Sequence, residues 1–378
     1  MKIAIPAEAD KTEARVAATP ETVRKFAGLG AEVTVEAGAG AGSDFADARY
    51  REAGATVAKT LAQTVGGAAV VLTVGRPSAE QVAAIARETV VVGQMDPSAA
   101  RAGLEAMAKA GLTVFAMELM PRITRAQSMD VLSSQSNLAG YKAVIDAAAT
   151  YGRAMPMMMT AAGTVAPAKV FVMGAGVAGL QAIATARRLG AIVTATDVRP
   201  AAKEQVASLG AKFVAVEDEE FRAAETAGGY AREMSAEYRK KQAELVAEHI
   251  KSQDIVITTA LIPGRPAPEL VSRAMVESMK PGAVIVDLAV ERGGNVAVAK
   301  PGKVVKHKGV TVVGHLNVAG RLAADASSLY ARNLFNFLHP LIESGELRID
   351  WEDEIVSGTL VARDGRIVHP MLTSGGKP

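Results

Sequence analysis

The segment from Lys169 to Arg199 constrains the fold of this chain more than any other. It begins with the apolar run Val170–Met173, which is typical of a strand buried on both faces. Three glycines follow in G-x-G-x-x-G spacing: Gly174, Gly176 and Gly179. A helical run then leads to a second apolar strand that ends at Asp197. This order of elements predicts a dinucleotide-binding βαβ unit.

Each part of this unit has a physical role in holding a dinucleotide. Gly174 allows the tight turn after the strand, Gly176 lets the backbone approach a pyrophosphate, and Gly179 lets the helix pack close to the strand. The helix N-terminus offers free N–H groups and the positive end of its dipole. Asp197, 23 residues after Gly174, stands where a carboxylate would accept the ribose hydroxyls, which favours NAD over NADP. Arg199 weakens that preference, because a nearby arginine can accommodate a 2′-phosphate.

Composition excludes several other classes of protein. The 378 residues are enough for two domains, and the net charge of +2 comes from scattered charges that do not predict a nucleic-acid surface. Cysteine is absent, so disulfides, thiolate metal sites and cysteine nucleophiles are excluded. The N-terminus turns charged too early for a signal peptide, and no apolar stretch reaches the roughly 18 residues of a membrane span. We therefore expect a soluble, cytoplasmic protein.

Strands and helices alternate over residues 1–120. The expected strands are Lys2–Ile5, Glu32–Glu36, Ala69–Val74, Val90–Gly93 and Thr113–Met117, and the expected helices include Thr19–Gly28, Ala79–Arg87 and Ala99–Ala110. Strands separated by helices indicate a parallel sheet covered on both faces. Gly38, Gly40 and Gly42 also follow a strand, but without the third glycine at the right distance we interpret them as a turn. The predicted fold class is α/β, with two Rossmann-like domains whose parallel sheets are separated by a nucleotide-binding cleft.

The domain boundaries follow from this alternation. We expect a discontinuous N-terminal domain of residues 1–133 and 325–378, and an NAD(H)-binding domain of residues 134–324. The amphipathic helix Ser327–Leu338 is expected to return to the N-terminal domain, and residues 353–370, DEIVSGTLVARDGRIVHP, are predicted to end the chain as a hairpin.

Residues 121–152 contain a dense group of polar side chains. The group comprises Arg122, Arg125, Gln127, Ser128, Asp130, Ser133, Ser134, Gln135, Ser136 and Asn137, and a helix is expected from about Ser136. Such a segment beside an interdomain cleft could bind a ligand or could be a solvated loop, and its composition leaves both interpretations open.

Two more segments have alternative interpretations. Met155–Met159, followed by Gly163 and Pro167, is typical of a hairpin whose methionines could form an oligomer contact or join the core. Residues 218–251 are polar, with a Gly-Gly-Tyr step at 228–230 before a charged helix expected at Ser235–His249. This loop, about 218–234, could be a mobile flap or a plain surface loop.

Further strands are expected at Gly210–Val216, Asp254–Ala260, Ala283–Ala289 and Val310–Gly314. Of the five histidines, only His315 follows the end of one of these strands, where ligands bind in an open α/β sheet. Oxidation of an alcohol or amine needs a general acid–base residue, and His315 is a weak candidate for it. The sequence thus predicts a nicotinamide site but offers only a weak residue for proton transfer. Direct hydride exchange between two nicotinamides requires positioning alone and fits this combination.

Long collinear segments carry a family resemblance. They are AMELMPRITRAQSMDVLSSQSNLAGY, MMMTAAGTV, GVAGLQAIATA, TAGGYAREM, TTALIPGRPAP and VSGT. From Met1 to about Pro370 the chain resembles the NAD(H)-binding component of proton-translocating NAD(P) transhydrogenase.

The resemblance implies a set of site residues. By position, Arg122, Gln127 and Asp130 would be catalytic and would orient the nicotinamide, its ribose and its phosphates, with Ser128 and Met129 in the same loop and Ser133 on the carboxamide. Val177 would lie at the pyrophosphate, and Asp197, Val198 and Arg199 at the adenosine ribose. Gly229 and Tyr230 would belong to a loop that closes over the nucleotide. Gln242 and Leu261 would line the adenosine side and the cleft.

The resemblance also implies partners. A hydride would pass between NADH on this chain and NADP⁺ on a separate NADP(H)-binding subunit, and a membrane-spanning proton-channel subunit would couple this transfer to proton movement. The chain would be a homodimer, peripheral on the cytoplasmic face of the inner membrane, with NAD(H) as its own cofactor, NADP(H) only on the partner, and neither metal nor nucleic acid.

Alanine dehydrogenase is the rival interpretation, because it shares the segment MKIAIPAEAD…EARVAATP, including Arg15 as the counterpart of a substrate-carboxylate ligand. Its substrate-binding lysine corresponds to Thr73, its catalytic histidine to Gln94 and its catalytic aspartate to Glu291. These replacements argue against amino-acid oxidation. A non-catalytic NAD-binding or regulatory module remains a third hypothesis.

Overall fold

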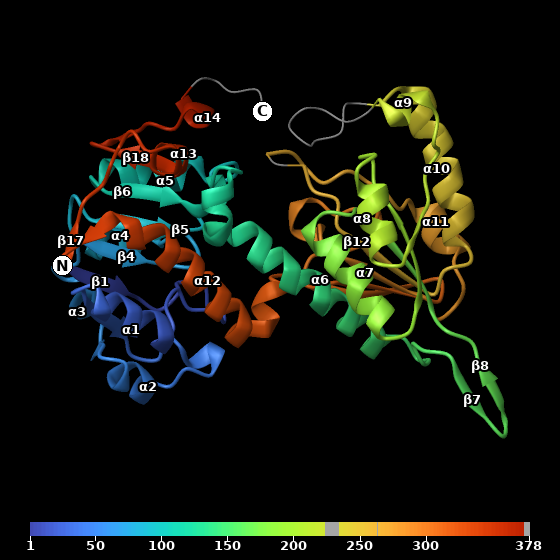
Figure 1. Ribbon diagram of the computed structural model, residues 1–378, viewed down its shortest axis with the longest axis horizontal. Coiled ribbons are helices and arrows are strands. Elements are labelled where there is room, and N and C mark those ends of the chain that lie inside the picture. Colours follow the sequence, from blue (N-terminus) through green and yellow to red (C-terminus); the bar gives the residue numbers. More distant parts are fainter. Residues whose placement is uncertain (224–233, 263, 374–378) are drawn as a thin grey trace. The chain divides into compact units, whose positions relative to one another are not determined.

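The computed structural model of the chain describes residues 1–223, 234–262 and 264–373 (Figure 1). The chain separates into two compact units. The first unit comprises Met1–Gln135 and Ala319–Pro378, and the second comprises Ser136–Val318.

The first unit is built on an eight-stranded sheet with the order β19-β18-β6-β5-β4-β1-β2-β3. Its strands are β1 (Lys2–Ile5), β2 (Glu32–Glu36), β3 (Thr56–Ala58), β4 (Val70–Leu72), β5 (Val90–Gly93), β6 (Thr113–Ala116), β18 (Leu360–Arg363) and β19 (Arg366–Ile367). All neighbours from β3 to β6 are parallel, whereas β18 runs antiparallel to both β6 and β19. The parallel part is doubly wound and reverses its strand order between β1 and β4.

Helices cover this sheet. They are α1 (Pro20–Gly28), α2 (Asp47–Glu52), α3 (Leu61–Val65), α4 (Ala79–Ala84), α5 (Arg101–Lys109), α12 (Ala323–Leu338), α13 (Glu354–Thr359) and α14 (Pro370–Thr373). Local sequence explains where α1 begins, since the Thr19 side chain accepts a hydrogen bond from the Thr22 backbone N–H and Pro20 occupies the first turn. From α12, the apolar residues Tyr330, Leu334 and Phe337 are buried in the core of the first unit.

The second unit has a seven-stranded sheet with the order β11-β10-β9-β12-β13-β15-β14. Its strands are β9 (Lys169–Met173), β10 (Ile192–Thr196), β11 (Lys212–Phe213), β12 (Ile255–Thr258), β13 (Val284–Asp287), β14 (Lys303–His307) and β15 (Val310–Gly314). Only the pairing of β14 with β15 is antiparallel among these described strands. The strand order reverses between β9 and β12, so the carboxyl ends of these two strands mark the topological switch point.

The other elements near this sheet are α6 (Val131–Thr150), α7 (Val177–Arg188), α8 (Ala202–Ser208), α9 (Glu219–Arg222), α10 (Ala236–Ile250) and α11 (Arg273–Ser278). The boundary between the two units falls within α6. The strands β7 (Met158–Thr160) and β8 (Gly163–Val165) form the predicted hairpin, which extends away from the sheet of the second unit (Figure 1).

The predicted fold class is confirmed: both sheets are predominantly parallel, doubly wound and Rossmann-like. Three local predictions were wrong. Helix α6 begins at Val131 rather than near Ser136, because the side chain of Asp130 caps it. The strand predicted over 210–216 is only Lys212–Phe213. Residues Glu354–Thr359 form α13, whose first N–H groups are capped by Asp353, so only 360–367 form a hairpin.

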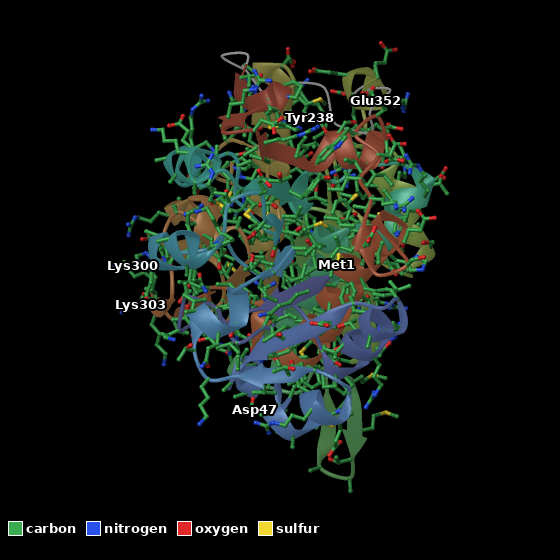
Figure 2. The ribbon with its side chains drawn as sticks, turned by 90° about the vertical axis from the view of Figure 1, so that its left-hand side faces the viewer. Met1, Asp47, Tyr238, Lys300, Lys303 and Glu352 are labelled. Carbon is green, nitrogen blue, oxygen red and sulfur yellow. The ribbon has the colours of Figure 1, made fainter. Side chains whose placement is uncertain are left out.

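The antiparallel strand β14 was not predicted from the sequence. It reads KVVKH, and its charged residues interrupt the apolar alternation that would have marked a strand. Lys303 begins this strand, and Lys300 lies three residues before it (Figure 2). Lysines on an edge strand discourage pairing with another chain, which explains why this strand is charged.

Candidate functional site

The glycine turn stands at the switch point of the second unit. Gly174 follows β9 with a φ of +102°, a conformation that favours glycine, and its N–H donates to the Thr196 carbonyl at 2.8 Å. A Cβ atom on Gly179 would lie 1.8 Å from the Gly174 carbonyl oxygen, so only glycine permits this approach of α7 to the turn. A Cβ on Gly176 would meet nothing within 4 Å. The backbone is therefore open at the N-terminus of a 12-residue helix.

A residue from the neighbouring strand fixes this turn. The hydroxyl of Thr259, immediately after β12, donates to the Gly174 carbonyl oxygen at 3.1 Å, and the Thr259 N–H donates to the Met173 carbonyl at 2.9 Å. The two strands that flank the switch point are thus tied together beneath the open backbone. This arrangement fits a pyrophosphate at the start of α7, where Val177 is exposed.

Asp197 lies at the end of β10 and turns back to the glycine turn. Its Oδ2 accepts the Ala175 N–H at 2.7 Å, and its Oδ1 accepts the Arg199 N–H and Nε, both at 2.9 Å. The side chain of Asp197 is only 7% exposed, whereas Val198 is exposed beside it. The acid is therefore held in place by the turn and partly neutralised by Arg199, the residue that weakened the preference for NAD over NADP.

Gln242 and Leu261 lie near the carboxyl edge of the same sheet. The side chain of Gln242, on α10, donates to Thr196 Oγ1 at 3.1 Å and accepts the Val216 N–H at 2.9 Å. Leu261 is exposed shortly after β12. Gly229 and Tyr230, predicted to belong to a closing loop, lie outside the described residues.

The other predicted residues lie in the first unit, between β6 and the first turn of α6. Residues Thr124–Met129 form a 3₁₀ helix in which Ala126 and Met129 are buried, while Gln127 and Ser128 are exposed. Arg122 is also exposed, just before this turn. The apolar residues therefore anchor the loop and leave Gln127 and Ser128 at its surface.

Asp130 and Ser133 are brought together as partners of each other. The Asp130 Oδ1 accepts the Ser133 N–H at 2.9 Å, and its Oδ2 accepts the Ser133 hydroxyl at 2.5 Å. This is the geometry of an N-terminal helix cap, and it gives both residues a structural role at the start of α6.

Two carboxyl groups, one buried and one partly buried, were missed by the sequence analysis. In the second unit, Asp287 at the end of β13 is fully buried, and its carboxylate accepts hydrogen bonds from Thr258, Ala289, Asn295 and Val296. Burial raises the pKa of Asp287. The sequence signal that could have identified Asp287 is its position at the end of the apolar strand Val284–Asp287. Among the described residues, no group of three His, Asp or Glu side chains is arranged to hold a metal ion.

The second missed carboxyl group is Glu8, at the switch point of the first unit. Its carboxylate accepts the backbone N–H groups of Val74 at 2.7 Å and Gly75 at 3.0 Å. Glu8 thus occupies N–H donors at the edge where an open sheet binds ligands. Arg15 nearby pairs with Glu13 and donates to Gln135 Oε1 at 2.8 Å, so its guanidinium is engaged within the protein.

We expect Glu8 to make stability depend on pH. Burial raises its pKa from 4.5 to about 7. Between these values the unfolded chain releases the proton first, so the free energy of unfolding should fall by about 3 kcal/mol as pH rises from 4.5 to 7, and then level off. Urea unfolding of the protein and of Glu8→Gln, at pH 4.5, 6 and 8, measures this. In Glu8→Gln the free energy of unfolding should not decline over this pH range. Parallel pH profiles of the two proteins would contradict the assignment of the raised pKa to Glu8.

Comparisons with known proteins identify the family. The family models described as "Alanine dehydrogenase/PNT, N-terminal domain" and "Alanine dehydrogenase/PNT, C-terminal domain" match residues 4–139 and 143–370. The chain is 58% identical over 383 residues, covering 100% of both proteins, to a protein of Rhodospirillum rubrum that is named as the first part of NAD(P) transhydrogenase subunit alpha. The crystal structure of transhydrogenase from Sinorhizobium meliloti matches with a TM-score of 0.90 and 60% identity, over 97% of this chain and 100% of that one.

Alanine dehydrogenase is more distant. That of Halomonas elongata is 29% identical over 377 residues, which cover 98% of this chain and 95% of that protein. In the described part of the chain, no helix is long and apolar enough to cross a membrane. The chain therefore belongs to the alanine dehydrogenase/PNT family of oxidoreductases, in which its sequence stands with the transhydrogenase alpha subunits rather than with the alanine dehydrogenases.

Proposed function

We propose that this chain is the NAD(H)-binding subunit of a proton-translocating NAD(P) transhydrogenase, in which a hydride passes directly between NADH and NADP⁺ held by a partner subunit. The observation that carries the proposal is the full-length similarity to a transhydrogenase alpha subunit, joined to the open glycine turn at the switch point of the second unit. The match covers the whole chain, and Thr73 and Gln94 stand where alanine dehydrogenase would have a lysine and a histidine, which argues against amino-acid oxidation.

The residues of the second unit supply the binding of NAD(H). We assign the pyrophosphate to the turn that Gly174 permits and to the backbone of Gly176 and Val177, because the backbone is open at the start of α7. Asp197 and Arg199 hold the adenosine ribose, with Val198 beside them. Gly179 serves the packing of the turn, while Gln242 and Leu261 complete the adenosine side.

The loop of the first unit supplies the orienting groups. We assign to Arg122 and Gln127 the orientation of the nicotinamide and its ribose, because their side chains are exposed on an anchored backbone. Asp130 and Ser133 act as a pair, since each is the hydrogen-bond partner of the other. NAD(H) supplies the hydride, so these residues have no proton to move and contribute geometry and exclusion of water.

The partners in this proposal are two further subunits. NADP(H) is held by an NADP(H)-binding subunit, and a membrane-spanning subunit carries the proton channel, so that this chain is peripheral on the cytoplasmic face of the inner membrane. Support comes from the relative in Rhodospirillum rubrum, whose name describes only one portion of an alpha subunit and which is similar over its whole length.

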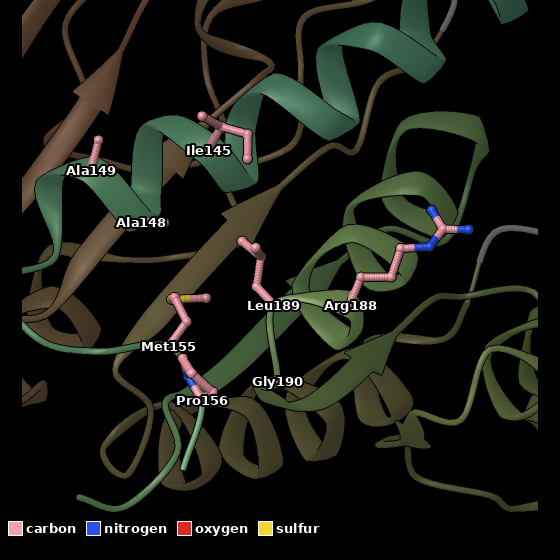
Figure 3. Close-up of a pocket in the computed structure, with 8 residues that line it drawn as sticks. All are labelled: Ile145, Ala148, Ala149, Met155, Pro156, Arg188, Leu189 and Gly190. Carbon is pink, nitrogen blue, oxygen red and sulfur yellow. The ribbon is translucent and has the colours of Figure 1, made fainter. Parts of the chain in front are cut away.

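We further propose that the chain is a homodimer with the β7–β8 hairpin at its contact. Every residue of both hairpin strands is exposed, and Met159 is 75% exposed. A two-stranded hairpin without packing is only marginally stable in water, so a covering surface is expected. An apolar pocket lies at its base, where Met155 and Leu189 lie near Ile145 of α6 while Arg188 points away (Figure 3).

Replacing Met159 with glutamate should weaken this dimer. The contact occurs twice in a two-fold dimer, so burying two new charges should raise the dissociation constant at least about 100-fold. Light scattering after size-exclusion chromatography measures the mass. Met371→Glu is the matched control, because Met371 is a similarly exposed methionine in the first unit. A Met159→Glu protein that stays dimeric would exclude the hairpin, and a monomeric unmodified protein would exclude the homodimer.

The experiment that tests the function is hydride transfer from NADH to acetylpyridine adenine dinucleotide, with and without a competent partner subunit loaded with NADP(H). Rapid transfer only with the partner is the expected result. Tight NADH binding without any transfer would instead indicate a binding module. Oxidation of NADH with pyruvate and ammonia would indicate alanine dehydrogenase activity.

Gln127→Asn should slow hydride transfer by about 10- to 100-fold with little change in NADH affinity. The shortened side chain keeps its amide but withdraws it from the nicotinamide, and misplacement by about 1 Å is enough for such a loss. Stopped-flow transfer and NADH fluorescence titration separate the two quantities. A large loss of affinity with an unchanged transfer rate would contradict the role assigned to Gln127.

A further inference from the structure

Two asparagines of α12 hold the backbone of the loop that carries Gln127. Asn333 Nδ2 donates to the Ser128 carbonyl oxygen at 2.8 Å, and Asn336 Nδ2 donates to the same oxygen at 3.0 Å. Residues three apart on a helix share one face, so both amides reach a single carbonyl. Ser128 follows Gln127 directly, but it is separated from α12 by about 200 residues of sequence.

The other end of the Asn333 amide is also engaged. Its Oδ1 accepts the hydroxyl of Ser134 at 2.7 Å, and Asn333 itself is only 7% exposed. The buried amide of Asn333 therefore joins Ser128 to the first turn of α6. Because both its donor and its acceptor are used, rotation of the amide would break bonds on both sides.

The loop needs this external support. Residues Thr124–Met129 form a 3₁₀ helix, a structure whose hydrogen-bond geometry is poor, and the Asp130 N–H to Gln127 carbonyl bond is long at 3.4 Å. In contrast, α12 is rigidly anchored, because Tyr330, Leu334 and Phe337 are buried in the core of the first unit. A weakly bonded short turn is thus attached to a fixed helix.

We propose that Asn333, with Asn336, is a positioning residue for hydride transfer: it fixes the Ser128–Met129 peptide, one residue beyond Gln127, and thereby the direction of the Gln127 side chain. This inference rests on the proposed function. It predicts that asparagine is specifically required at position 333, because an aspartate of the same shape would set a carboxylate against the Ser128 carbonyl oxygen in place of a donor.

The test uses the full chain with its NADP(H)-loaded partner subunit. Asn333→Asp and Asn333→Leu should slow hydride transfer by about 10-fold or more while the dissociation constant for NADH changes by less than about threefold. Asn336→Asp, which introduces the same charge one turn away, should have a smaller effect because its amide is less buried and Asn333 remains. Arg332→Gln is the matched control, since Arg332 pairs with the exposed Glu21 on α1, away from the loop.

Two readouts separate positioning from a general loss of structure. Amide hydrogen exchange of residues 124–130 should accelerate in both Asn333 variants and stay unchanged in Arg332→Gln, and this measurement needs no partner. In addition, Asn333→Asp combined with Gln127→Asn should be no slower than the slower single variant, because both changes remove the same positioning.

The outcomes are distinct. If the unmodified chain shows no transfer with a competent partner, the proposed function fails, while the exchange result still decides whether Asn333 holds the loop. Unchanged exchange in both Asn333 variants would overturn the inference. So would normal transfer rates in those variants, or rate losses in the double variant that multiply.

Discussion

Replacing Gly179 with alanine should lower NADH affinity by at least about 100-fold and destabilise the second unit, because the new methyl group has no space. Its Cβ would lie 1.8 Å from the Gly174 carbonyl oxygen, a backbone atom that cannot rotate away. Helix α7 must therefore move from β9 by more than about 1 Å, and overpacking of this kind costs about 1–3 kcal/mol or more. The shift also displaces the N–H groups at the start of α7.

Gly176→Ala is the control that separates packing from binding. Its Cβ would meet nothing within 4 Å, so the unfolding temperature should stay within about 2 °C of the unmodified protein. The methyl group would nevertheless stand where we place the pyrophosphate, so NADH affinity should fall. Thermal unfolding and NADH titration of both variants provide the comparison. Normal NADH binding by Gly176→Ala would contradict this placement of the dinucleotide.

Asp287→Ala should destabilise the second unit by about 3–5 kcal/mol, since it removes a buried acceptor on which four donors depend. Its two oxygens accept the Thr258 hydroxyl and the N–H groups of Ala289, Asn295 and Val296, at 2.9 to 3.1 Å. Alanine leaves all four donors buried without this partner. Burial raises the pKa of Asp287, but the hydrogen bonds favour its ionised form, so the network and the charge are interdependent.

Replacing Asp287 should also disturb the carboxyl edge of the sheet, where we place the nucleotide. Asn295, which Asp287 holds, accepts the Ala260 N–H at 3.0 Å and donates to the Ala260 and Pro268 carbonyls. We therefore expect weaker NADH binding in Asp287→Ala as well as a lower urea midpoint. Thr258→Val is the matched control, because it removes one of the four donors and should cost only about 1 kcal/mol. Equal losses in the two variants would contradict this expectation, because they would mean that the three backbone N–H donors add nothing beyond the Thr258 bond.

Local patterns account for the elements that the sequence predicted well. The turn after β9 depends on three glycines within six residues, and a backbone with a φ of +102° at Gly174 has few other solutions. Strands Lys2–Ile5, Glu32–Glu36, Val90–Gly93 and Val310–Gly314 were predicted with their observed bounds, because short apolar runs between helices have a strong periodic signal. The Rossmann-like fold class follows from such alternation.

The predictions of local structure that were wrong or missing share a cause. In each case a side chain acts at the end of a helix or at the edge of a sheet. Helix α6 begins early because the side chain of Asp130 replaces a missing backbone partner, and α13 begins because Asp353 does the same. Both acids occur in polar stretches that are equally typical of loops. The strand β14 lacks a periodic pattern because its lysines protect an edge, which is a property of its place in the sheet.

By itself, the sequence determined the dinucleotide-binding unit and the two doubly wound sheets, since these depend on residues close together in the chain. Tertiary structure alone decided that Asp197 accepts the Ala175 N–H, that Glu8 caps the N–H groups of Val74 and Gly75, and that Asn333 holds Ser128. The last two link residues 66 or more positions apart. Hydrogen bonds between such distant residues have no spacing to reveal them, because only the packing of the sheets and helices brings their atoms within reach.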